Sequence, residues 1–417
     1  MRKTIKNVCI FLVVVSTLFL LMFQFACDNS NIDMGGIRYL LSEDKTYYSV
    51  STLTENDSNI VEIQNEINNL PVKKILPNAF KNGKKLTSIF INSNMENIAD
   101  GVFEDCDKLS FISVAENNQN FSSKTGILYN KDKTELVYVP NLVSGEIMIP
   151  NSISCVNAEI FKNKKTIKTV AFENDSELQT IGFSAFEGCE NLETIKIPNS
   201  LTSIGGRAFA GCSNLSSVNL ENADNLLNIG VRAFAECKSL KSIVLPSNLT
   251  EISEGLFFKC ENLSNVTFPT VNFSVKEKAF WKCGFEKVNI TENFVAIESG
   301  AFSLNYNLTE FIADGNANFK VVDGDLYSKD GKTFMFYALK KSISPNVNET
   351  FTISSAVNKI LPYAFYDEDG KMTLRNIYLE GEIGWKYNGE NAQYLVNDSR
   401  DVAGLFRYSF AEGTWSR

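Results

Sequence analysis

The 417-residue sequence contains no histidine. Histidine is the usual general base near neutral pH and a frequent zinc ligand, so its absence disfavours enzymes and metal proteins. A Cys-His pair is impossible, and the sequence has neither a Gly-x-Ser-x-Gly motif nor a phosphate-binding glycine loop. We therefore expect a protein that is not an enzyme and that binds no cofactor and no metal.

Basic charge is scarce relative to acidic charge. The chain has 40 Lys and Arg against 49 Asp and Glu, which gives a formal net charge of −9. This balance argues against nucleic acid as a partner. Hydrophobic residues make up 44% and charged residues 21% of the chain, which is typical of a folded protein.

The apolar run near the amino terminus, residues 8–23, is short for a membrane-spanning helix, which needs about 20 residues. Three basic residues precede it and Ala26-Cys27 follows it, so residues 1–27 are predicted to be a signal peptide and the chain to be exported. The segment resembles the lipobox of bacterial lipoproteins, which implies lipid attachment at Cys27, although Gln24 stands where leucine is usual. An uncleaved anchor and an ordinary signal peptide remain as alternatives.

A short motif recurs with a period of 23 to 25 residues in the middle of the chain. It reads Ile-Gly-Phe-Ser-Ala-Phe-Glu-Gly-Cys at 181–189 and Ile-Gly-Gly-Arg-Ala-Phe-Ala-Gly-Cys at 204–212, and related copies follow to residue 283. Such a period predicts a solenoid, in which each repeat is one coil and buries its apolar face by stacking on its neighbours. The phenylalanine of this motif, always five residues after Ile or Val, recurs as Phe80, Phe103, Phe161, Phe186, Phe209, Phe234, Phe257, Phe280, Phe302 and Phe365.

A short apolar alternation follows each motif, as in Thr194-Ile195-Lys196-Ile197. We expect these segments to pair into a parallel sheet with Ile195 inside and Thr194 and Lys196 outside. The Ala-Phe segment is then expected on the opposite wall, with Phe filling the core and Ala at a place too tight for a large side chain. The predicted fold is an α/β solenoid of coils of about 23 residues with a parallel sheet on one face.

Two longer gaps between repeat phenylalanines predict inserts near 118–145 and 316–345. Gly126-Ile-Leu-Tyr in the first resembles Gly324-Asp-Leu-Tyr in the second, and both predict hairpins followed by an additional strand. Asp323, Asp325 and Asp330 could form a calcium loop, but Tyr327 stands where an oxygen ligand is needed, so we favour the hairpin.

The predicted organisation is a signal peptide at 1–27, an amino-terminal linker and cap at 28–72, a solenoid at 73–380 and a carboxy-terminal cap at 381–417. Alternating apolar residues predict strands in the first cap, and the second could contain a helix within 392–410.

One cysteine lies three residues after the phenylalanine in most repeats. A row of thiols could form disulfides or a metal site. Burial as free thiols is favoured, because Gly83 and Asn305 fill the same position in other coils. The six cysteines are Cys106, Cys189, Cys212, Cys237, Cys260 and Cys283.

The repeat Ile-Gly-x-x-Ala-Phe-x-x-Cys-x-x-Leu-x-x-Ile-x-Ile-Pro-x-Ser-Leu-Thr at 181–202 resembles the BspA-like leucine-rich-repeat surface proteins of host-associated bacteria and some protozoa. The resemblance extends from about residue 60 to residue 379. It departs at the coil around Phe285, which is a 22-residue step, and at Glu368, which replaces a cysteine. It implies a lipoprotein on the outer membrane or cell surface that attaches to host matrix proteins or to other bacteria and provokes innate immune recognition.

The outward side of the predicted strands is the candidate binding face. Its side chains are mostly small, polar and uncharged, which suits a broad contact with host extracellular-matrix or cell-surface proteins, with other bacteria or with glycans. An ordinary solvated face, in a structural envelope lipoprotein without a dedicated ligand, is the alternative. The candidate residues are Thr194, Lys196, Ser217, Asn219, Ser242, Asn265, Thr267, Lys287, Asn289 and Glu310.

Overall fold

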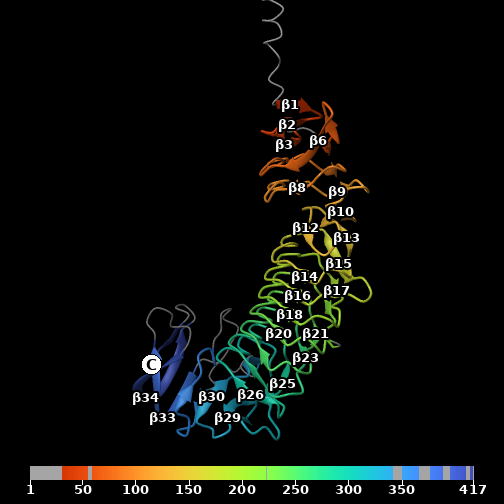
Figure 1. Cartoon of the computed structure of the whole chain (residues 1–417). Helices are drawn as coiled ribbons and strands as arrows, with labels where there is room; N and C mark the ends of the chain where they lie inside the picture. The colour runs from red at the N-terminus through yellow and green to blue at the C-terminus, as the bar shows by residue number, and fades with distance from the viewer. Residues whose placement is uncertain are drawn as a thin grey trace, which may run out of the picture. The chain divides into compact units, whose positions relative to one another are not determined.

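The computed structural model describes residues 31–54, 59–221, 223–340, 350–365, 376–387, 395–409 and 414–416 (Figure 1). The predicted signal peptide and Cys27 lie outside these ranges. Within them, no helix is both long and apolar enough to cross a membrane. The chain forms two compact units, Met1–Asp132 with Pro140–Leu142, and Lys133–Val139 with Val143–Arg417.

The first unit combines an antiparallel start with parallel strands. β1, β2 and β3 pair antiparallel, β3 pairs β6 in parallel, and β6 pairs β8 in parallel. A second parallel sheet has the order β4-β7-β9. The strands are β1 (Asn31–Met34), β2 (Ile37–Leu41), β3 (Tyr48–Leu53), β4 (Ile60–Glu62), β5 (Glu66–Ile67), β6 (Leu70–Ile75), β7 (Ser88–Ile91), β8 (Asn97–Ile98), β9 (Phe111–Val114), β10 (Phe121–Lys124) and β11 (Ile127–Asn130).

The second unit repeats one coil in which a strand of the outer sheet alternates with a two- to four-residue strand that leads to the repeat phenylalanine (Figure 1). Its strands are β12 (Leu136–Tyr138), β13 (Gly145–Ile149), β14 (Cys155–Val156), β15 (Ile167–Phe172), β16 (Thr180–Ile181), β17 (Thr194–Ile195), β18 (Ser203–Ile204), β19 (Ser217–Val218), β20 (Asn228–Ile229), β21 (Ser242–Val244), β22 (Glu251–Ile252), β23 (Asn265–Thr267), β24 (Phe273–Val275), β25 (Lys287–Asn289), β26 (Phe294–Ile297), β27 (Glu310–Ile312), β28 (Phe319–Val322), β29 (Asp325–Ser328), β30 (Thr333–Phe336), β31 (Thr350–Ile353), β32 (Lys359–Ile360), β33 (Asn376–Tyr387), β34 (Leu395–Ser409) and β35 (Thr414–Ser416).

The described residues form a β-solenoid and contain no α-helix, so the helical part of the predicted α/β class is not confirmed. Helix is missing because the wall opposite the outer sheet is a run of tight turns, with too few consecutive residues of one backbone conformation for a helical turn to continue. The helix considered within 392–410 is also wrong where the structure describes it, since 395–409 is strand β34.

The repeat phenylalanines stack ring on ring in the core of each unit. In the second unit Phe209 is fully buried and lies 5.4 Å from the Phe186 ring and 5.2 Å from the Phe234 ring. Burial of such a side chain contributes about 2–3 kcal/mol, so this column is a main source of stability. The expected tightness of the alanine position is wrong in one coil, because Leu256 occupies it and is also fully buried.

Two residues with left-handed backbone flank each repeat phenylalanine, two positions before and two positions after it. The second-unit pairs are Glu159 and Asn163, Ser184 and Gly188, Arg207 and Gly211, Arg232 and Glu236, Gly255 and Lys259, Lys278 and Lys282, and Gly300 and Leu304. This alternation turns every other N–H toward the next coil: Arg207 N donates to Val231 O and Phe209 N to Ala233 O, at 2.9 and 2.8 Å. The wall is therefore a hydrogen-bonded ladder of turns.

The glycine of the Ile-Gly motif is required by close approach of the backbones of adjacent coils. A Cβ on Gly205 would lie 2.6 Å from main-chain atoms of Gly182 and Phe183. The cysteine of the motif links coils as well, because the buried Cys212 thiol donates to Phe186 O at 3.2 Å. All six predicted thiols are buried and free, as predicted.

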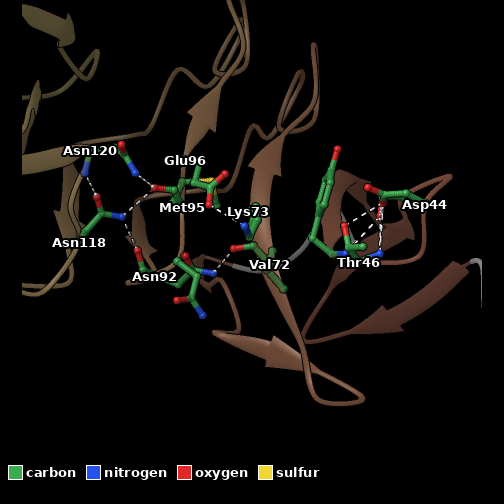
Figure 2. Close-up of polar contacts among 12 residues, drawn as sticks. Asp44, Thr46, Val72, Lys73, Asn92, Met95, Glu96, Asn118 and Asn120 are labelled. Carbon is green, nitrogen blue, oxygen red and sulfur yellow. Dashed lines mark hydrogen bonds and ion pairs between the residues drawn. The ribbon is translucent and has the colours of Figure 1, made fainter.

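Both predicted inserts fold as hairpins fixed by one Asn-x-Asn-Phe motif, which sequence reasoning missed. In the first, Asn118 donates to Asn92 O and Met95 O at 2.8 and 3.1 Å, and its Oδ1 accepts from Asn120 N and Phe121 N (Figure 2). In the second, Asn316 donates in the same way to Thr291 O and Phe294 O and accepts from Asn318 N and Phe319 N. Each Asn satisfies main-chain groups where the coil gives way to the hairpin.

Candidate functional site

The ten predicted face residues lie in two rows on the outer strands of the second unit. The strand registers place Thr194 beside Ser217, Ser242 beside Asn265, and Lys287 beside Glu310. We name these rows by their members. Outer row 1 is Thr194, Ser217, Ser242, Asn265, Lys287 and Glu310, and outer row 2 is Lys196, Asn219, Thr267 and Asn289. Seven of the ten side chains are exposed, and Thr194, Asn219 and Glu310 are half-buried.

The sheet that carries these rows is interrupted. Strands β13, β15, β17 and β19 form one parallel sheet, β21 and β23 a second, and β25 and β27 a third. On the opposite wall the coils stay in contact, because the Phe257, Phe280 and Phe302 rings stack at 5.4 and 5.2 Å. The separation of β23 from β25 is therefore confined to the strand side of the coils.

The interruption has a local cause in the sequence. Between the repeat cysteine and the next core residue, Cys260 is followed by Glu-Asn-Leu263, whereas Cys283 is followed only by Gly284-Phe285. The shortened loop runs so close to the preceding coil that a Cβ on Gly284 would lie 2.8 Å from Glu261 O. One residue fewer before β25 prevents it from taking the usual register beside β23.

A groove with a volume of about 760 Å³ opens at this interruption. Ligand sites are typically concave and of this order of size. Four predicted face residues, Asn265, Thr267, Lys287 and Asn289, line it. The other lining residues come from the strands and from the loops that follow them: Ser264, Val266, Phe268, Pro269, Thr270, Phe285, Val288, Thr291, Glu292, Asn293, Ile312, Asp314 and Gly315.

The groove exposes part of the layer beneath the sheet. Val266 points inward from β23 and is only half-buried, whereas the inward Ile243 and Val288 of adjacent coils are 3% and 1% exposed. Phe268 is also half-buried, with its ring 5.8 Å from Phe273 and 4.8 Å from Phe294. The groove thus combines an apolar floor with polar sides, the usual composition of a binding site.

Charge around the groove is uneven. Lys287 forms an ion pair with Glu310 at 2.6 Å, and the hydrogen bond to that carboxylate raises the pKa of Lys287. Glu292 and Asp314 make no ion pair with any residue that the structure describes. The groove therefore carries an excess of negative charge, and its remaining polar groups are neutral amides and hydroxyls.

No arrangement for catalysis or metal binding was found in the described ranges. They contain no group of three or more Cys, Asp or Glu residues placed to hold a metal ion. The repeat thiols stay protonated, since burial raises the pKa of Cys106 to about 11 and that of Cys189 to about 12. The chemistry that the outer face offers is recognition by hydrogen bonding and apolar contact.

The first unit has an apolar counterpart of this face that sequence reasoning missed. On sheet β4-β7-β9, Ile60 is 70% exposed, and the outward Phe90 and Phe111 are also exposed. The alternation around Phe90 was a signal, because its neighbours Ile89 and Ile91 point inward and are buried.

The architecture is that of a leucine-rich-repeat protein. Residues 48–135, 138–252 and 227–329 match the model for the BspA type leucine rich repeat region in six copies. The chain therefore belongs to the BspA-type leucine-rich-repeat family, which confirms the resemblance found in its sequence. No curated protein matches the chain.

Solved structures of bacterial leucine-rich-repeat proteins are similar to this chain. A protein from Bacteroides ovatus is 22% identical with a TM-score of 0.48, over 84% of this chain and 89% of that one. A protein from Eubacterium ventriosum is 20% identical with a TM-score of 0.45, over 70% and 98%. A leucine rich cell surface protein from Faecalibacterium prausnitzii is 18% identical with a TM-score of 0.40, over 83% and 76%.

Proposed function

We propose that this protein is an exported surface adhesin that contacts host matrix proteins, host cells or other bacteria through outer rows 1 and 2. The observation that carries the proposal is the groove at the interruption between β23 and β25, which brings four predicted face residues together. A coil that only stacked would gain from an unbroken ladder of strands, whereas this one exposes apolar side chains and uncompensated charge on one face.

We propose that the chain is held at the membrane by a lipid on Cys27. The basic start, the short apolar run and Ala26-Cys27 support this proposal. Mass spectrometry of the mature amino terminus tests it: a diacylated Cys27 is expected, and a free terminus at another residue contradicts lipid attachment. Protease treatment of intact cells should release fragments of the chain, whereas a chain that stays uncut faces inward and excludes the adhesin.

Binding is tested with the purified chain on immobilised matrix proteins and on intact bacterial partner cells. Saturable binding that weakens at high salt is expected, because the groove carries exposed carboxylates. Absence of saturable binding to both matrix proteins and cells would contradict the proposed function. A matched pair of variants locates the contact: Asn289→Trp fills the groove, and Lys196→Trp places the same side chain in outer row 2 outside it.

A further inference from the structure

The groove leaves a specific set of polar groups without partners, and an intact part of the same sheet shows what such groups bind. In outer row 2, Asn219 donates from Nδ2 to Ile197 O at 3.3 Å and accepts from Ile197 N at Oδ1 at 2.8 Å. Ile197 belongs to the extended segment of the preceding coil. The Asn219 amide therefore pairs with both main-chain groups of an extended residue.

Asn289 occupies the corresponding position two coils... after the interruption, because it follows the inward Val288 as Asn219 follows the inward Val218. Its counterpart partner is Phe268, two residues after Val266 as Ile197 is two residues after Ile195. Among the described residues, neither the Asn289 amide nor the main-chain N–H and C=O of Phe268 makes a hydrogen bond. The opening of the ladder has separated two groups that pair elsewhere.

We propose that the groove binds an extended peptide segment of a partner protein, with its main chain paired to the Asn289 amide and to the main chain of Phe268. Addition of an extended segment to interrupted strands uses main-chain hydrogen bonds for affinity and alternate side chains for specificity. The inference rests on the proposed function and names the chemical form in which the partner is recognised.

The walls of the groove define the sequence of such a segment. Alternate side chains point in opposite directions along an extended chain. Those that point inward meet Val266 and Phe268, which favours small or medium apolar residues. The unpaired Glu292 and Asp314 at the rim favour Lys or Arg near the ends of the segment, since Lys287 is already paired with Glu310.

Selection of a display library of random short peptides on the purified full chain tests this inference. We expect enriched peptides with alternating apolar residues and basic ends. A synthetic copy should lose at least about tenfold in affinity when alternate peptide nitrogens are methylated, because methylation removes main-chain donors. Asn289→Trp and Asn289→Leu should each weaken binding by about tenfold or more, and Lys196→Trp should change it by less than about twofold.

The melting temperature and far-ultraviolet spectrum of each variant control for folding, and Asn289 is exposed, so all three variants should match the parent. Peptides that bind Asn289→Trp as tightly as the parent, or that tolerate methylation, would overturn the inference. So would failure to enrich any peptide, and neutral oligosaccharides that bind the parent but not Asn289→Trp would then assign the groove to glycans. Attachment to partner cells that persists in Asn289→Trp refutes the groove while leaving the proposed function standing.

Discussion

At the scale of single residues, backbone conformation rather than side-chain chemistry explains much of the repeat. The position two residues after the repeat phenylalanine has positive φ whether it is Gly188, Gly211, Glu236 or Lys259. Any side chain with a Cβ is disfavoured in this conformation by about 1 kcal/mol, and glycine is not. The coils that carry Glu236 and Lys259 therefore contain strain that the stack compensates.

A reciprocal pair of substitutions tests this strain. We expect Glu236→Gly to raise the free energy of unfolding by about 0.5–1 kcal/mol, and Gly211→Glu to lower it by a similar amount. A Cβ on Gly211 would approach no atom closer than 3.7 Å, so the loss reports backbone conformation and not a clash. Urea denaturation measures both, and effects of the same sign in the two variants would contradict this explanation.

The buried thiols predict a fall in stability at alkaline pH. Burial raises the pKa of Cys189 to about 12, above the value of about 8.5 for an exposed thiol. Its contribution is therefore fully present below pH 8.5 and is lost as the pH rises toward 12, by about 1.4 kcal/mol per pH unit. Urea midpoints of the parent should fall more steeply between pH 9 and 11 than those of Cys189→Ala. Equal slopes, or alkylation of native Cys189 at pH 8, would show that this thiol is exposed.

At the scale of the coil, the phenylalanine column decides stability and was predictable from sequence. Its period, its inward strands and its buried cysteines all follow from one repeated apolar pattern. The absence of helix was not predictable from that pattern, because the turns depend on alternating left-handed residues as different as Ser184, Arg207 and Lys278. Hydrophobic periodicity does not report such backbone alternation.

Truncation of one ring in the column should be costly. Phe209→Ala is expected to lower the free energy of unfolding by about 3–5 kcal/mol, because it leaves a cavity between Phe186 and Phe234. Phe183→Ala is the matched control, since Phe183 is 53% exposed, and should cost less than about 1 kcal/mol. Equal losses in denaturant titrations of the two variants would show that the column is not the core.

The candidate site was only partly predictable for a physical reason at the same scale. The ten face residues follow from strand alternation, and the structure places them in two rows. The groove depends on one residue missing between Cys283 and Phe285, which changes strand register. A shortened coil was visible in the sequence, but its effect on pairing requires the positions of adjacent backbones, such as the approach of Gly284 to Glu261.

At the scale of the whole molecule, the interior and the outer face have separate roles. The interior is a column of rings, thiols and backbone ladders that any number of coils could extend. The two units also differ on their outer faces, with exposed Ile60, Phe90 and Phe111 in the first and mostly neutral polar rows in the second. The proposed function assigns recognition to the face of the second unit.

Attachment of cells that display the full chain to matrix-protein surfaces tests this central assignment most directly. Three variants with one tryptophan each are compared at equal surface levels: Asn289→Trp in the groove, Ser242→Trp in outer row 1 and Lys259→Trp on the opposite wall. The account predicts that attachment falls by about tenfold for Asn289→Trp, falls less for Ser242→Trp and is unchanged for Lys259→Trp. Loss of attachment for Lys259→Trp alone, with both outer-row variants unaffected, would contradict it.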